Sequence, residues 1–168
     1  PVADAGQDTL MCENDSIQLN GSAFGGLPSY SFTWSPANSL NTTNGSSVYA
    51  SPSVNEIYKL QVEDANGCFD SSFVAVEVKE LPDINANDLN LCIGDSGIIN
   101  TTINGNGPYN FNWSPNQYIN NTSVQSPLVY PPVDTSYIIQ VEDVYSCVNY
   151  DTSQVSLYPY PVPDFTAS

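Results

Sequence analysis

The chain has 168 residues, with two basic residues, 18 acidic residues and no histidine, and its formal net charge at neutral pH is −16. A surface this acidic cannot replace the counterions of a nucleic-acid backbone and is repelled by an anionic membrane, which excludes both as binding partners. Since no apolar run approaches the roughly 20 residues of a membrane span, membrane insertion is not expected either.

Strand patterns dominate the first half of the chain. Tyr30, Phe32 and Trp34 alternate with small polar residues, and a second alternation begins at Tyr58. Because neighbours on a strand point to opposite faces, each set shares one face, which we expect to be buried. A further strand is predicted over residues 73 to 78. Asn-Gly and Gly-Gly pairs separate these segments and predict tight turns.

The same order of elements recurs in the second half. Tyr109, Phe111 and Trp113 alternate as before, the next strand begins at Tyr137, and the last one covers residues 154 to 158. Such a repeat with shared landmarks is typical of tandem copies of one module. We therefore predict one repeat over residues 1–82, a second over 83–162, and a linker or the start of a further repeat over 163–168.

Short strands separated by turn-forming residues favour an all-β fold of two tandem immunoglobulin-like or PKD-like antiparallel β-sandwich domains, with about six or seven strands each. We expect four large rings in the two cores, namely Trp34, Tyr58, Trp113 and Tyr137. Proline restricts the short linker at Leu81 and Pro82, so the two domains are expected to follow one another stiffly.

The chain has four cysteines, Cys12, Cys68, Cys92 and Cys147. Four cysteines allow three disulfide connectivities, and a copy of about 80 residues is small enough to need a covalent constraint. The pairing that makes each copy self-contained joins Cys12 to Cys68 and Cys92 to Cys147. Disulfides in small domains indicate an oxidising compartment, so an extracellular location is expected. A zinc site is disfavoured because no closely spaced cysteine pair or histidine is present.

The motifs of both copies resemble a known family. A cysteine, then YSFTWSP, then a Tyr-led strand ending in DANGC (residues 64 to 68) resemble the immunoglobulin-like and PKD-like repeats of very large secreted surface adhesins of Bacteroidota, including gliding-type adhesins. The second copy departs from the motif with DVYSC at residues 143 to 147. The resemblance implies a sandwich module that serves adhesion or spacing at the cell surface, and it implies no catalytic activity.

Calcium is the one cofactor that the sequence leaves open. Asp4, Asp8, Asp64 and Asn66 offer the oxygen ligands that this cation prefers, near expected domain ends. In the second copy Asn85 and Asp88 correspond only roughly. The competing interpretation, which we favour, is that these residues lie in solvated loops and that the protein has no cofactor.

No catalytic site is predicted, and the protein is not expected to be an enzyme. The commonest general base, histidine, is absent, and no Ser or Cys has an evident activating partner. Adjacent carboxylates occur at Glu63 and Asp64 and at Glu142 and Asp143, but strand neighbours point to opposite faces and cannot act on one bond.

The sequence therefore predicts a non-catalytic stalk or filament spacer whose partners are neighbouring repeats of the same polypeptide. One alternative is a glycan-binding accessory module of a secreted hydrolase, with sugars stacked on surface tyrosines: Tyr118, Tyr130, Tyr145, Tyr150 or Tyr160. Another is self-assembly into a filament by exchange of an end strand, for which the segment DFTAS at residues 164–168 is the candidate.

Overall fold

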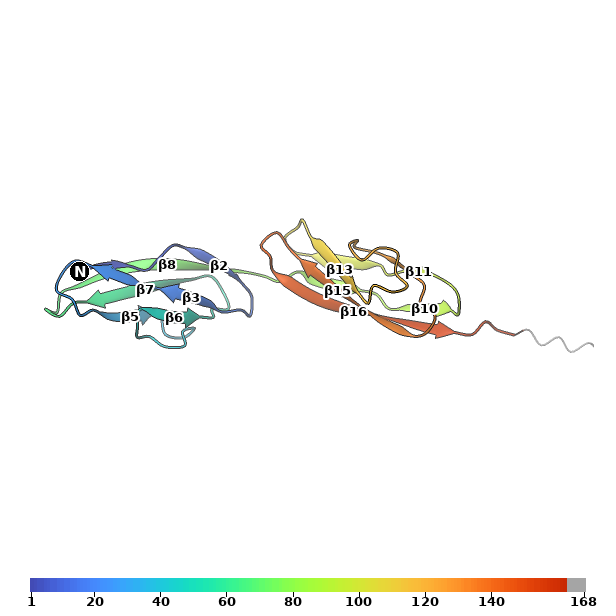
Figure 1. The fold of residues 1–168 in the computed structure, drawn as a ribbon, viewed down its shortest axis with the longest axis horizontal. Helices are drawn as coiled ribbons and strands as arrows, with labels where there is room; N and C mark the ends of the chain where they lie inside the picture. The colour runs from blue at the N-terminus through green and yellow to red at the C-terminus, as the bar shows by residue number, and fades with distance from the viewer. Residues whose placement is uncertain (163–168) are drawn as a thin grey trace, which may run out of the picture. The chain divides into compact units, whose positions relative to one another are not determined.

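The structure, a computed structural model, describes residues 1–162 (Figure 1). Two compact units divide the chain: Pro1–Glu80, which we call module 1, and a second unit beginning at Leu81, which we call module 2. The predicted linker or further repeat at 163–168, including the DFTAS segment, lies outside the described residues. No helix long and apolar enough to cross a membrane occurs in residues 1–162.

The described residues form eight strands in each module. Those of module 1 are β1 (Val2–Asp4), β2 (Thr9–Cys12), β3 (Ile17–Asn20), β4 (Ser22–Phe24), β5 (Ser31–Ser35), β6 (Ser47–Ala50), β7 (Glu56–Glu63) and β8 (Phe69–Lys79). Those of module 2 are β9 (Asp83–Ala86), β10 (Leu89–Cys92), β11 (Gly97–Ile98), β12 (Thr101–Asn104), β13 (Asn110–Ser114), β14 (Leu128–Val129), β15 (Thr135–Glu142) and β16 (Val148–Tyr158).

In module 1 four strands form a sheet in the order β2-β8-β7-β5, and two short pairs, β1-β4 and β3-β6, complete the sandwich (Figure 1). The pairing of β2 with β8 is parallel, whereas β7 pairs antiparallel with both β5 and β8. Module 2 repeats this topology with the sheet β10-β16-β15-β13 and the pairs β9-β12 and β11-β14. The prediction of two tandem immunoglobulin-like β-sandwiches is confirmed.

The core of each module is built around one tryptophan and one tyrosine. Trp34 and Trp113 are 1% exposed, and Tyr58 and Tyr137 are fully buried. In module 1 these rings pack with Leu19 of β3 and with residues of β6, β7 and β8, so the core joins the four-stranded sheet to a short pair. Burying side chains of this size stabilises a fold by about 1.5–3 kcal/mol each.

The polar atoms of these rings are satisfied in both modules. The indole nitrogen of Trp34 donates to the carbonyl oxygen of Gly45 at 3.0 Å, and that of Trp113 donates to Val124 at 2.9 Å. The hydroxyl of Tyr137 donates to the carbonyl oxygen of Gln117 at 3.1 Å. Burial raises the pKa of Tyr58 and of Tyr137 above the ordinary value of 10.0, so both hydroxyls keep their proton and can donate.

The eight strands of each module exceed the predicted six or seven, and in module 1 two short strands lie on either side of Gly21. The strand before it, β3, pairs with β6, and the strand after it, β4, pairs with β1. Gly21 also lies against the core: a Cβ atom at this position would stand 2.5 Å from Leu60 Cδ2 and 3.0 Å from Trp34 Cζ2. The Asn20-Gly21 pair therefore marks a close approach of the backbone to the core rather than the predicted hairpin turn.

Candidate functional site

The turn between β7 and β8 is organised by the carboxylate of Asp64. Its Oδ1 accepts hydrogen bonds from the backbone nitrogens of Asn66 at 2.9 Å and Cys68 at 3.0 Å, and its Oδ2 accepts one from Leu27 at 3.1 Å. The amino terminus of Pro1 lies 3.9 Å from the same Oδ2. The bond from Leu27 is the main cause that holds the pKa of Asp64 below its ordinary value of 3.8, because donors favour the charged form.

Asp143 closes the equivalent turn in module 2, which lacks the Asn-Gly pair. Its Oδ1 accepts hydrogen bonds from Tyr145 at 2.8 Å and Cys147 at 2.9 Å. Ser146 takes the left-handed conformation with φ 63°, where Gly67 has φ 78° in module 1. The departure at residues 143 to 147 thus preserves the turn. One difference remains, since Asp143 Oδ2 is buried without a hydrogen-bond partner among the described residues.

A second repeated aspartate anchors the last long strand of each module. Asp8 Oδ1 accepts a hydrogen bond from the backbone nitrogen of Ala75 at 2.8 Å, and Asp88 Oδ1 accepts one from Gln154 at 2.7 Å. Both donors belong to the longest strand of their module. These carboxylates therefore fasten the segment before β2 or β10 to that strand, which is a structural task.

The four residues predicted as calcium ligands do not form one site. Asp4 Oδ1 accepts a hydrogen bond from the backbone nitrogen of Gly6 at 2.9 Å. The carboxylates of Asp8 and Asp64 accept hydrogen bonds from the backbone nitrogens of Ala75 and Cys68. Asn66 enters this network through its backbone nitrogen. Asn85, one of the two counterparts in the second copy, lies within β9 and pairs with Thr102 of β12. Within residues 1–162 no group of three or more His, Cys, Asp or Glu side chains is placed to hold a metal ion.

The two adjacent carboxylates of each hairpin differ in their exposure to solvent. Glu63 is exposed, whereas Asp64 is 6% exposed and engaged in the turn. In module 2 Glu142 is half-buried, and Asp143 is 4% exposed and engaged in the turn. A glycosidase needs two carboxyl groups that flank one bond, and these two pairs do not provide them.

Of the five tyrosines predicted as a sugar platform, the structure places Tyr118 and Tyr130 together. Their ring centroids are 6.1 Å apart with an interplanar angle of 88°, and both are nearly half exposed. Tyr145, Tyr150 and Tyr160 are also exposed. Tyr160 donates from its hydroxyl to Asp95 Oδ1, and this hydrogen bond is the main cause that raises the Tyr160 pKa.

The predicted disulfide pairing within each copy is wrong. Cys68 and Cys92 are free thiols, whereas Cys12 and Cys147 are disulfide-bonded. The topology explains why. Cys12 is in register with Lys79, the last residue of β8, whereas Cys68 directly precedes Phe69, its first residue. A strand of 11 residues is about 35 Å long at roughly 3.3 Å per residue, and a disulfide needs Cα atoms closer than about 7 Å.

Module 2 separates its cysteines in the same manner. Cys92 is in register with Tyr158, the last residue of β16, and Cys147 directly precedes Val148, its first residue. The two cysteines of a module therefore lie at opposite ends of its longest strand. Sequence spacing alone could not reveal this, because the parallel pairing of β2 with β8 and of β10 with β16 leaves no mark in the residue pattern.

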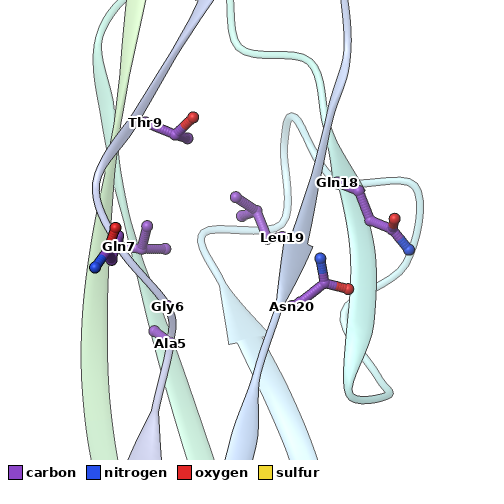
Figure 2. Close-up of a pocket in the computed structure, with 8 residues that line it drawn as sticks. Ala5, Gly6, Gln7, Thr9, Gln18, Leu19 and Asn20 are labelled. Carbon is purple, nitrogen blue, oxygen red and sulfur yellow. The ribbon is translucent and has the colours of Figure 1, made fainter.

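One surface hollow of module 1 lies between the segment joining β1 to β2 and strand β3 (Figure 2). Its volume is about 190 Å³, and Gln7, Thr9, Gln18 and Asn20 supply its polar lining around Leu19. Pockets that bury a small-molecule ligand occupy roughly 300–1,000 Å³. The hollow is too small for such a ligand, and no ionisable side chain lines it.

Comparison with known proteins returns no matching family model and no matching curated protein. Among solved structures the chain is similar to the first two immunoglobulin domains of DIP-gamma, with 11% identity, a TM-score of 0.40, and coverage of 95% of this chain and 99% of that one. It is also similar to titin domains I67–I69, with 13% identity, a TM-score of 0.42, and coverage of 93% and 65%. It is similar as well to the insect immune protein hemolin, with 14% identity, a TM-score of 0.46, and coverage of 92% of this chain and 46% of that one.

Proposed function

We propose that this chain is a pair of repeat modules from a large extracellular protein, in which each module is a non-catalytic unit of structure or adhesion. The observation that carries the proposal is that the two modules share one fold and the same structural residues. The same tryptophan, tyrosine and turn aspartate occupy equivalent places in both modules, and the aspartates that the two modules share bind backbone nitrogens of their own module.

The turn and anchor aspartates illustrate this use. Asp64 and Asp143 each close a hairpin, and Asp8 and Asp88 each fasten a strand segment, so all four serve their own module. A site that evolved for one reaction would need such groups to converge on a common point instead. Hydrogen bonds that stabilise each module separately, and that recur in both, suit a spacer built of repeated domains.

Two features support a location outside the cell. Cys12 and Cys147 are disulfide-bonded, and disulfides persist mainly in oxidising compartments. The net charge of −16 gives a soluble, self-repelling surface that suits a repeat array. The resemblance to repeats of Bacteroidota surface adhesins gives the finer form of the proposal, in which the modules form part of a cell-surface stalk.

Antibodies raised against residues 1–168 test this proposal on intact cells of the source organism. We expect labelling of unpermeabilised cells or of their secreted fraction, and we expect the full gene to encode further copies of the module. Labelling only after permeabilisation, or a gene that attaches these modules to a catalytic domain, would contradict the proposal.

The exposed Tyr118–Tyr130 pair favours one second candidate, weak glycan binding by module 2. Aromatic faces can stack on sugar rings, but the perpendicular arrangement of these two rings does not form one flat platform. A glycan array that compares the wild-type chain with the double variant Y118A/Y130A tests this candidate. Binding that disappears in the variant supports it, and absence of binding by the wild-type chain removes it.

A further inference from the structure

The outward face of the four-stranded sheet of module 1 carries exposed apolar side chains. Ile57 of β7 and Phe73 of β8 are 65% and 60% exposed, and Leu10 of β2 is 43% exposed. Ile57 is in register with Ala75, and Lys59 is in register with Phe73, so these residues stand side by side on one face. Contiguous exposed apolar residues mark interaction surfaces, which makes this face a candidate contact surface.

Module 2 has no apolar side chains at the corresponding positions. The register of Tyr58 with Val74, and of Tyr137 with Ser153, aligns the two sheets residue by residue. Exposed polar residues then take the four places: Asn90 for Leu10, Ser136 for Ile57, Thr152 for Phe73 and Gln154 for Ala75. The sandwich therefore forms without an apolar outward face, and the cluster in module 1 serves something other than folding.

Phe73 and Ala75 form a protrusion and a depression two residues apart on β8. A shallow hollow of about 430 Å³ bounded by Leu10 and another of about 290 Å³ bounded by Ile57 flank Ala75, and Ala75 and Glu77 line both. The exposed ring of Phe73 stands about 7 Å away along the strand, at roughly 3.3 Å per residue. A ring and a hollow on one face suit a second copy related by a two-fold axis, because the ring of each copy can enter the hollow of the other.

The charges on this face are complementary in the same arrangement. The register of β7 with β8 places Lys59 beside the protruding ring. The hollows are lined by the carboxylates of Asp8, Glu56 and Glu77, and the one cation near them, Lys79, forms an ion pair with Glu77. In a two-fold pair the Lys59 of each copy approaches the carboxylates of the other. The two lysines are the only basic residues of a chain of net charge −16, so two copies repel each other least at this face.

We propose that two copies of this chain associate through the outward sheet face of module 1, about a two-fold axis. The Phe73 ring of each copy fills the hollow beside Ala75 of the other, and Lys59 of each copy faces Glu77 of the other. The two sheets then pack face to face, about 10 Å apart. This inference goes beyond the proposed repeat function, because it concerns one module and holds whether or not the chain forms part of a stalk.

Sedimentation velocity of the wild-type chain tests the association. The free thiols of Cys68 and Cys92 are blocked first, so that no disulfide-linked dimer contributes. Chain concentrations from about 1 μM to about 1 mM cover weak and moderate association. We expect the mass to rise with concentration from 18.2 kDa towards twice that value. A monomer at every concentration would overturn the proposal and assign the face to a partner other than this chain.

Two variants that carry the residues of module 2 test the contact itself. Phe73→Thr removes the ring, and Ala75→Gln fills the hollow. At a concentration where the wild-type chain is half dimeric, we expect each to lower the dimer fraction several-fold. Phe24→Thr is the matched control, because Phe24 is 63% exposed but lies on β4, which pairs with β1 outside the four-stranded sheet. Circular dichroism verifies that the variants keep the wild-type fold, and an equal loss of dimer in Phe24→Thr would overturn the proposal.

An equimolar mixture of the two variants tests the reciprocal arrangement. Phe73→Thr keeps the hollow and Ala75→Gln keeps the ring, so a mixed pair retains one of the two ring-in-hollow contacts, whereas a pair of identical variants retains none. We expect several-fold more dimer in the mixture than in either variant alone at the same total concentration. An equal amount of dimer in all three samples would overturn the proposed geometry. Neither result would alter the surface labelling that tests the proposed function.

Discussion

Asp64 and Cys68 are joined by two hydrogen bonds that close the β7–β8 turn. The backbone nitrogen of Cys68 donates to Asp64 Oδ1 at 3.0 Å, and the backbone nitrogen of Asp64 donates to the carbonyl oxygen of Cys68 at 2.9 Å. Asp143 and Cys147 repeat both bonds in module 2, at 2.9 and 3.0 Å. The second cysteine of each module is therefore held by an aspartate four residues before it.

The two turn aspartates differ at their second oxygen, which predicts different costs for the same substitution. In D64N an amide nitrogen can face the N–H of Leu27, which is itself a donor, whereas Asp143 Oδ2 has no described partner to lose. We expect D64N to lower the unfolding midpoint in urea by more than D143N does. Equal losses in the two variants would contradict the role given to the Leu27 bond.

Acid should weaken module 1 through its bonded carboxylates. The pKa of Asp70 is held below 3.8 mainly by the hydrogen bond from Ala3, and that of Asp64 mainly by the bond from Leu27. A lowered folded pKa contributes stability that is present above the ordinary pKa and is lost as pH falls through the folded value. We expect D70N to destabilise the chain at pH 7 and to differ progressively less from wild type below about pH 4.

The comparison with D70N matters because acid also neutralises the charge of −16 and so relieves self-repulsion. Relief of self-repulsion stabilises the folded state as pH falls, and it is nearly equal in the wild-type chain and in D70N. Urea titrations of the two proteins between pH 7 and pH 2.5 isolate the contribution of Asp70. A difference between them that stays constant over this range would refute the prediction.

Gly21 should tolerate no side chain. A Cβ atom there would overlap Leu60 and crowd Trp34 in the core. Overpacking of this kind typically costs about 1–3 kcal/mol of unfolding free energy, so we expect that loss for G21A. The exposed neighbour Ser22 supplies the control, because S22A should change stability by less than about 0.5 kcal/mol. A neutral G21A would show that the backbone lies farther from the core than described.

Thr101 stands at the position of module 2 that corresponds to Gly21. It is 4% exposed, and its hydroxyl oxygen has no hydrogen-bond partner among the described residues. Replacing a buried, unpaired hydroxyl with a methyl group of the same shape removes a desolvation cost, so T101V should leave stability unchanged or raise it by about 1 kcal/mol. T102V, at an exposed position of the same strand, is the control. A clear loss in T101V alone would mean that the hydroxyl has a partner.

The strand pattern was readable from the sequence because burial enforces it. Trp34 and Tyr58 alternate with polar residues, and the structure buries both rings, as it does Trp113 and Tyr137. The close approach of Gly21 to the core was not readable, since an Asn-Gly pair is also a common turn signal. Only the Leu60 and Trp34 side chains, distant in sequence, give this glycine its role.

The cysteine pairing failed for a related reason. The spacing of Cys12 and Cys68 suited a bond within one copy, but which end of the sandwich a residue occupies depends on strand direction and register. The parallel register of Cys12 with Lys79 decides the matter, and it arises from tertiary pairing. The role of Asp64 did leave a signal, because an aspartate precedes the second cysteine by four residues in both copies.

Non-reducing peptide mapping of the chain tests the central claim most directly, after free thiols have been blocked with an alkylating reagent. The account predicts that the reagent labels Cys68 and Cys92 and leaves Cys12 and Cys147, which are disulfide-bonded, unlabelled. A linked pair joining Cys12 to Cys68, or Cys92 to Cys147, would contradict the placement of the two cysteines at opposite ends of each module.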